Sequence, residues 1–359
     1  MSGAGALAVS QLRAPTVDRP TWLQQLVDGV VEGGLATSVA AVVGGARWVS
    51  AAAASGDARS ASGEGEPLFD LASLTKLWTA SLALRLDARG SLPLGTPLGA
   101  LWPNCDRRLA RRTLEELLRH RAGFQPWAPI YRRCRRRSTV AGLLVGGQLL
   151  GARRGTYSDL DYMLWGLSAK HALGRSLAEL LRRELVGPLG LEAAPTAGAV
   201  WLPCALGNGR EVELAAAQGI RVGRLGPPET GRVQDGNARF LGAPAGHAGL
   251  FASPRALFAL AREWLSPGAL WSAAASAAAL SGPGRFVVGW RRASRRGSGG
   301  PALSPGSYGH VGFTGGSVWV DPQRHRILVL LAHRASLSAD LAPARRRFHA
   351  LASAARDSA

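Results

Sequence analysis

The chain has 359 residues, of which 47% are hydrophobic, and it carries a formal net charge of +19. A chain of this length and composition can bury a large core, which argues against a disordered or fibrous protein. The cations are almost all arginine and are spread through most segments without interleaved aromatic residues, a pattern typical of a solvated surface rather than of a base-stacking platform. We therefore expect no specific nucleic-acid partner.

The cysteines and the N-terminus constrain the class of protein further. Cys105, Cys134 and Cys204 lie far apart without C-x-x-C spacing, so neither a disulfide framework nor a zinc site is predicted. Residues 1–19 lack a basic segment followed by an apolar core, which argues against a secretory signal, and we expect a disordered tail there. No run of about twenty apolar residues predicts a membrane span. We expect a cytoplasmic location, and the oligomeric state stays open.

Patterns along the chain predict one large domain over residues 20–340. Apolar residues at helical spacing over residues 20–34 predict an amphipathic helix. Short β-rich runs broken by glycine follow over residues 35–70 and predict strands joined by tight turns. Helical patterns dominate from about 77 to 250, and they end in a turn-rich stretch over residues 226–249. Irregular stretches of that length are often functional.

The last third of the chain returns to β-rich patterns over residues 285–335, with a first run at residues 285–294. Within the second run, D-P-Q-R predicts the turn of a hairpin. Residues 341–359 predict a C-terminal helix that packs on the sheet. Strands near both ends of the chain and helices between them predict one antiparallel sheet flanked by helices, beside a mostly helical second region. This is an α/β fold of the α+β type, with a cleft between the two regions.

Ser73 and Lys76 form an S-x-x-K sequence at the predicted start of a helix. Residues three apart lie on the same helix face, so the lysine can reach the serine hydroxyl. A lysine can act as the base for a serine if burial or nearby cations lower its pKa. Lys76 is one of only two lysines and follows an apolar segment that should be buried. We interpret the pair as a nucleophile and its base; the alternative is a capping serine and a solvated lysine.

Two later stretches carry further candidate residues. Tyr157 comes just before a predicted helix, for which Asp159 could serve as the N-cap. His310 comes shortly before Gly312 and two more glycines at the start of a predicted strand. Glycine there allows a ligand or another backbone to come close, although a β-bulge is the structural alternative.

Taken in order, F-D-L-A-S-L-T-K, Y-S-D and H-V-G-F-T-G-G resemble the S-x-x-K, Y-x-N and K-T-G segments of the serine β-lactamase family. The branch in question includes class C β-lactamases, D-alanyl-D-alanine carboxypeptidases and related esterases. L-E-E-L-L-R-H-R-A-G-F and A-G-H-A-G-L-F-A-S are similar to other segments of that family, and coverage runs from roughly residue 20 to 335. The resemblance implies the β-lactamase/transpeptidase-like fold and an enzyme that needs no cofactor and no metal.

The resemblance also implies roles for individual residues. Ser73 would attack a carbonyl group and form an acyl-enzyme, while Lys76 and Tyr157 would share the general-base and general-acid work. The backbone N–H groups of Ser73 and Phe313 would form the oxyanion hole. The substrate would be an ester, an amide or a β-lactam-like small molecule.

The substrate-binding positions depart from the family pattern. His310 takes the place of the K-T-G lysine, beside Gly312, and a histidine is mostly neutral near pH 7. Val311 lacks the threonine hydroxyl, and Asp159, at the Y-x-N asparagine position, would repel a carboxylate. We therefore predict an ester or a small amide as substrate. The alternatives are a β-lactamase or D-alanyl-D-alanine carboxypeptidase, a non-catalytic penicillin-binding-like sensor and, ranked last, a nucleic-acid binder.

Overall fold

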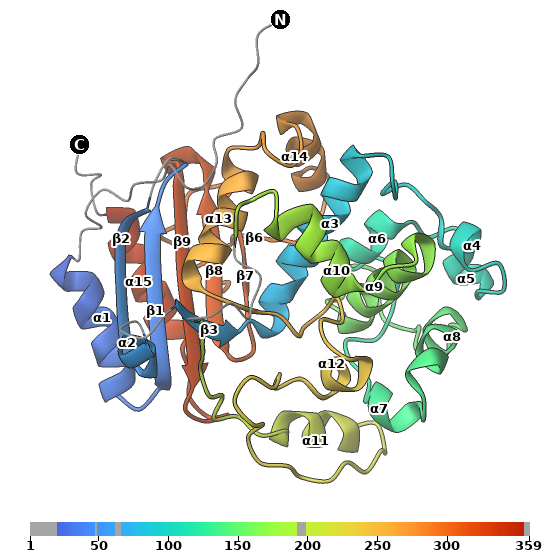
Figure 1. The fold of residues 1–359 in the computed structure, drawn as a ribbon, viewed down its shortest axis with the longest axis horizontal. Helices are drawn as coiled ribbons and strands as arrows, with labels where there is room; N and C mark the ends of the chain where they lie inside the picture. Colours follow the sequence, from blue (N-terminus) through green and yellow to red (C-terminus); the bar gives the residue numbers. More distant parts are fainter. Residues whose placement is uncertain (1–19, 47–48, 62–65, 192–198, 355–359) are drawn as a thin grey trace, which may run out of the picture.

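The computed structural model describes residues 20–46, 49–61, 66–191 and 199–354, and the tail predicted over residues 1–19 lies outside them. Figure 1 shows a sheet made from both ends of the chain beside a helical region made from its middle. The strands are β1 (Ala36–Gly44), β2 (Val49–Gly56), β3 (Glu66–Asp70), β4 (Ala199–Trp201), β5 (Phe251–Ala252), β6 (Arg291–Arg292), β7 (Tyr308–Val311), β8 (Gly315–Asp321) and β9 (Arg326–Arg334).

The main sheet has the strand order β2-β1-β9-β8-β7-β6, and every neighbouring pair in it is antiparallel. The first strand of the chain thus pairs with the last, with Val39 opposite Ala332. β8 and β9 form the predicted hairpin, in which Val320 faces Ile327 across a short 3-10 turn capped by Asp321. A second, smaller sheet has the order β4-β3-β5.

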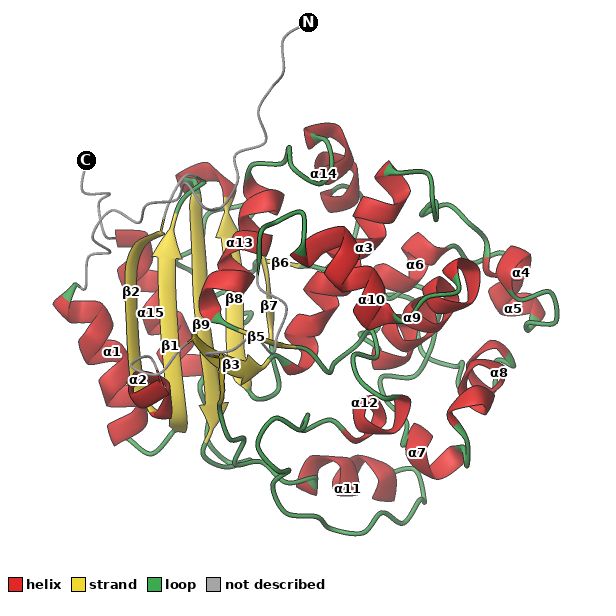
Figure 2. Ribbon diagram, in the orientation of Figure 1, coloured by secondary structure: helices red, strands yellow, loops and turns green. Residues whose placement is uncertain are grey.

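Helices cover the sheet and build the second region, as Figure 2 shows in red. The α-helices are α1 (Thr21–Glu32), α2 (Asp57–Ala61), α3 (Thr75–Ala88), α4 (Leu98–Leu101), α5 (Arg107–Ala110), α6 (Leu114–Leu118), α7 (Ile130–Arg133), α8 (Val140–Val145), α9 (Asp159–Leu173), α10 (Leu177–Leu181), α11 (Gly209–Ala216), α12 (Gly236–Leu241), α13 (Pro254–Leu265), α14 (Ala273–Leu280) and α15 (Ala342–Ala354). Shorter turns are η2 (Ala72–Leu74), η3 (Arg137–Thr139), the π-helical η4 (Arg182–Val186) and η5 (Pro322–Arg324). In the part of the chain described here, no helix is both long and apolar enough to cross a bilayer.

Side chains alternate along each strand, so successive residues point to opposite faces of the sheet. Different helices bury these two faces. Val39 and Val43 of β1 join one apolar cluster with residues of α1 and α15, whereas Val42 joins a second cluster that extends into the helical region. In α1, the buried residues are those at the predicted helical spacing, Leu23 and Val27 among them. α13 packs on the opposite face, against β1, β8 and β9. Burial on both faces explains why β1 reads as a nearly continuous apolar run.

The expected strand over residues 285–294 is mostly wrong, because only the two residues of β6 are extended into the sheet. The backbone N–H of Val287 donates to the carbonyl of Trp290, which closes a tight turn. Gly289 adopts φ +80 there, and a Cβ at this position would lie 2.4 Å from Cβ of Ala80 in α3. The apolar residues of this run therefore fill the space above α3 instead of lining a strand.

Candidate active site

Ser73 lies in η2, the single turn that connects β3 to α3 where the sheet meets the helical region. Ala72 beside it adopts φ +44, a conformation that residues with a Cβ seldom adopt. The buried Asp70 carboxylate stabilises this turn, since it accepts hydrogen bonds from the backbone N–H groups of Ala72 (2.9 Å) and Gln234 (2.7 Å). Burial raises the pKa of Asp70 to about 6. Thr314 also donates to the Asp70 carbonyl at 2.8 Å, so the backbone next to Ser73 is held from several sides.

Lys76 lies in the first turn of α3 and is fully buried. Its Nζ donates to Oγ of Ser73 (3.0 Å), to Oδ1 of Asp159 (2.7 Å) and to the carbonyl oxygen of His247 (3.0 Å). Burial by itself would lower the pKa of Lys76, but the carboxylate of Asp159 and then Tyr157 outweigh it, and the pKa is raised. Lys76 is therefore an ammonium ion at neutral pH, with all three of its protons engaged.

Tyr157 lies just before α9, and its hydroxyl donates to Oγ of Ser73 at 2.8 Å. Its ring centroid lies 4.6 Å from that of His120 and 5.8 Å from that of Phe286, which fixes the ring from two sides. Burial raises the pKa of the Tyr157 hydroxyl, and the nearby Lys76 ammonium only partly opposes this effect. At neutral pH the residue is a neutral phenol that can donate a proton.

The raised pKa of Lys76 differs from the expectation drawn from the sequence, in which a base at this position needs a lowered pKa. An ammonium group cannot accept the proton of Ser73, and the Ser73 oxygen already accepts hydrogen bonds from Lys76 and Tyr157. A proton has to leave Lys76 before this lysine can serve as a base. The carboxylate of Asp159, 2.7 Å from Nζ, is placed to receive it.

His310 on β7 borders the same space, with its ring centroid 5.9 Å from that of Tyr157. Burial lowers its pKa to about 3, and the charges of Lys76 and Arg291 act in the same direction. Nδ1 donates to the carbonyl of Val311 at 2.9 Å, which leaves Nε2 as a buried acceptor with no partner among the described residues. The ring is thus neutral and presents a hydrogen-bond acceptor, where an ammonium would present donors.

Gly312 allows the end of β7 to run close to η2. A Cβ on this residue would lie 2.8 Å from the carbonyl oxygen of Leu71, a separation that a real Cβ does not tolerate. The close approach brings the backbone of Phe313 toward the turn that carries Ser73. The Phe313 ring is covered by the guanidinium of Arg334, whose carbon lies 4.7 Å from the ring centroid.

Known proteins are similar to this chain over most of its length. The family model described as Beta-lactamase matches residues 23–352. The chain belongs to the β-lactamase family. A relative from Escherichia coli K12, named a putative D-alanyl-D-alanine carboxypeptidase, is 29% identical over 310 residues, which cover 74% of this chain and 69% of the relative. The homologue of the same name from Escherichia coli O157:H7 is 30% identical over 311 residues, with the same shares covered.

Solved structures of this family share the fold. A β-lactamase from Mycobacterium bovis aligns over 89% of this chain and 96% of its own, with a TM-score of 0.57 and 21% identity. EstCE1, described as a hydrolase with promiscuous acyltransferase activity, aligns over 91% and 97% with a TM-score of 0.67 and 19% identity. The predicted β-lactamase/transpeptidase-like fold is therefore confirmed, and the chain is a member of a serine hydrolase superfamily.

Asp159 is not the N-cap of α9, the position that the sequence pattern allowed for it. The N-cap of α9 is Ser158, whose Oγ accepts from the backbone N–H of Leu160 at 3.1 Å. Asp159 is instead the first residue of the helix, and its carboxylate is directed at Lys76. The resemblance to the Y-x-N segment implies an asparagine at this position, where this chain has a carboxylate beside Lys76.

Lys76 is also supported by His247, a contact that no local sequence pattern indicated. His247, whose carbonyl binds the lysine, has its ring held between Oδ1 of Asp235 (3.0 Å from Nε2) and the carbonyl of Ala245 (3.2 Å from Nδ1). Burial opposes a charge on this ring, but the Asp235 carboxylate outweighs it and raises the pKa of His247. The only sequence signal was the length of the turn-rich stretch over residues 226–249. No cluster that could hold a metal ion is found among the residues described.

Proposed function

We propose that this β-lactamase-family protein is a serine hydrolase that forms an acyl-enzyme on Ser73, with an ester or a small amide as substrate. The observation that carries the proposal is the convergence of two proton-carrying groups on one serine oxygen: Nζ of Lys76 at 3.0 Å and the hydroxyl of Tyr157 at 2.8 Å. Such convergence is what nucleophilic catalysis by a serine requires.

In the proposed acylation step, the proton of Lys76 moves to Asp159, and the resulting amine takes the proton of Ser73. Oγ of Ser73 then bonds to the substrate carbonyl carbon. Tyr157 gives its proton to the leaving group as the bond to that group breaks, and it takes a proton back from Lys76. The backbone N–H groups of Ser73 and Phe313 would stabilise the negative charge on the carbonyl oxygen. In the second half, the Lys76 amine removes a proton from water, the water oxygen bonds to the acyl carbon, and Oγ of Ser73 leaves with a proton from Tyr157. Tyr157 then recovers a proton from Lys76, and Asp159 returns its proton to Lys76, which restores the starting state and releases the acid.

The environment of His310 supports the substrate class. Because its ring is neutral and Nε2 is an unpartnered acceptor, it would bind a substrate N–H or O–H and would hold a carboxylate weakly. The carboxylate of Asp159 neutralises the charge of Lys76, so this ion pair offers no net positive charge to a substrate carboxylate. An ester or amide without a carboxylate next to the scissile bond suits these groups best.

The test is hydrolysis of p-nitrophenyl acetate by the wild type and by Ser73→Ala. We expect the variant to lose hydrolysis while its thermal unfolding is unchanged, and a serine-reactive phosphonate to add its mass to the wild type only. Ser81→Ala is the matched control, since Ser81 is also buried on α3 and bonds only to Trp264 among the described residues. Full activity in Ser73→Ala would remove the proposal, and an inert Ser73 toward every electrophile would favour a non-catalytic sensor.

A second candidate is a D-alanyl-D-alanine carboxypeptidase or β-lactamase, which the names of the relatives at 29% and 30% identity favour. A penicillin would then add its mass to Ser73. Later loss of that mass would indicate β-lactamase turnover, and persistence would indicate carboxypeptidase-like trapping. A panel of esters, amides and D-alanyl-D-alanine peptides ranks the candidates by kcat/KM.

A further inference from the structure

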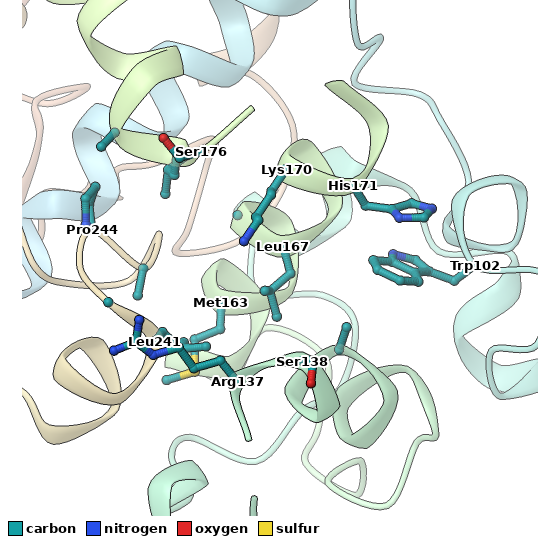
Figure 3. A pocket seen from close by; sticks show the side chains of 16 residues that line it. Trp102, Arg137, Ser138, Met163, Leu167, Lys170, His171, Ser176, Leu241 and Pro244 are labelled. Atoms are coloured by element: carbon teal, nitrogen blue, oxygen red, sulfur yellow. The ribbon is translucent and has the colours of Figure 1, made fainter. Parts of the chain in front are cut away.

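A cavity of about 780 Å³ lies against α9, with its lining drawn from several helices. Figure 3 shows its lining side chains, which come from α9, the start of α10, the η3–α8 segment, the end of α12 with the chain that follows it, and Trp102 after α4. The volume falls within the range of small-molecule sites, roughly 300 to 1,000 Å³. None of the residues proposed for acyl transfer lines it.

The charges that border the cavity all have one sign. Arg137 and Lys170 both lie on its wall, and no aspartate or glutamate lies there. Neither cation has an ion-pair partner among the residues that the structure describes, although many other arginines of this chain do. Lys170 is also the second of the two lysines in a chain that otherwise uses arginine. Each cation is therefore free to bind an anionic group at the cavity wall.

The rest of the lining is apolar and shaped. Met163 and Leu167 form a floor on α9, between the side chains of Arg137 and Lys170 in Figure 3. The Arg137 side chain lies over Gly242, where an added Cβ would be 2.7 Å from a guanidinium nitrogen. This glycine therefore makes room for the arginine to lie along the cavity wall.

An aromatic pair closes another side of the cavity. The rings of Trp102 and His171 are stacked, with centroids 4.3 Å apart and planes at 22°. Nε1 of Trp102 donates to Oγ of Ser168 at 2.9 Å, which fixes the indole. A rigid aromatic wall, an apolar floor and two unpaired cations are complementary to a molecule with an apolar body and an anionic end.

We propose that this cavity is a second binding site, separate from Ser73, for an organic carboxylate with an aliphatic body. The carboxylate would bind one of the two cations at the cavity wall, and the aliphatic part would cover Met163 and Leu167, which lie between Arg137 and Lys170. The proposal does not depend on the proposed hydrolase activity, because no residue of the acyl-transfer site takes part in it.

The experiment is isothermal titration of the full chain carrying Ser73→Ala, so that no hydrolysis contributes, with sodium octanoate as the probe. Octan-1-ol and acetate are the comparison probes, since the first lacks the charge and the second lacks the apolar body. We expect one octanoate site, with at least tenfold weaker binding of both comparison probes. The double variant Arg137→Gln, Lys170→Gln should weaken octanoate binding at least tenfold.

Two controls separate this cavity from other sites. Arg132→Gln with Arg133→Gln removes the same charge from α7, outside the cavity lining, and should leave octanoate binding unchanged. Ala178→Trp places a large side chain on the exposed edge of the cavity and should also abolish binding without touching the charges. Equal affinity for octan-1-ol, or unchanged octanoate affinity in the Arg137/Lys170 double variant, would overturn the proposal.

Discussion

Replacement of Asp159 by asparagine separates the two effects that this carboxylate has on Lys76. Asparagine keeps the size and a carbonyl acceptor but removes the charge that lies 2.7 Å from Nζ. With an effective dielectric constant of about 20, that attraction is about 6 kcal/mol before the desolvation of the two charges is subtracted. Loss of it lowers the pKa of Lys76 and leaves a buried ammonium without its counter-charge, which costs about 3 to 5 kcal/mol of stability.

The assay is the pH dependence of kcat/KM for p-nitrophenyl acetate. If activity requires Lys76 to lose its proton, the limb that rises with pH moves to lower pH in Asp159→Asn. If Asp159 also receives that proton, the plateau falls by about 10²- to 10⁴-fold, the usual contribution of a general base. Asp28→Asn removes a carboxylate paired with Arg59 far from the site and should change neither quantity. A limb that stays in place would refute the assignment of the ion pair.

The stability effect has its own pH window. The folded-state pKa of Lys76 is raised, so the pair stabilises the fold fully below the unfolded value of about 10.4, and this contribution is lost as the pH rises through the folded value. The contribution of the pair to the stability of the wild type should therefore be constant from pH 6 to 9. In Asp159→Asn the pKa of Lys76 is lowered, so the difference in unfolding free energy from the wild type should shrink once the pH exceeds that lowered value, as measured by urea denaturation.

Two further predictions follow from buried histidines. His310→Lys restores an ammonium at the substrate side, so the KM for substrates that carry a carboxylate should fall about tenfold relative to that for uncharged esters; an equal change for both classes would contradict the role given to His310. Burial lowers the pKa values of His333 and His349 to about 4. The free energy of unfolding should therefore fall by about 2 kcal/mol for each histidine between pH 7 and pH 5. Asp70, whose pKa is raised to about 6, stabilises the fold over the same pH range and offsets part of this loss. Urea denaturation at both pH values should show a smaller loss for His349→Gln, and an identical loss would contradict this account.

The parts of the site that depend on local spacing were predictable from the sequence. Ser73 and Lys76 are separated by three positions in the sequence, so any helical turn brings their side chains together. In the structure, Nζ of Lys76 lies 3.0 Å from Oγ of Ser73. Tyr157 is 84 residues further along than Ser73, and only the resemblance to a family indicated that its hydroxyl would reach the same oxygen.

Other features could not be predicted, because they depend on how elements pack. The contact between Asp159 and Lys76 requires α9 to begin beside α3, which no local pattern specifies. Asp70 reads as the polar end of a strand, yet its carboxylate holds the turn at Ala72. The run at residues 285–294 has strand composition, but the turn at Gly289 against α3 prevents an extended backbone. In each case tertiary contacts override the local preference.

The pairing of the first and last strands has a consequence for synthesis of the protein on the ribosome. β9 fills the place between β1 and β8, so one edge of each of these strands stays unpaired until residues 326–334 have been made. Ser73 and Lys76 emerge early, but the sheet that closes behind them waits for nearly the whole chain. During that interval β1 presents an unpaired apolar edge, which is a site for aggregation. Chains truncated before β9 should therefore be captured by chaperones or degraded, and they should contain no assembled site.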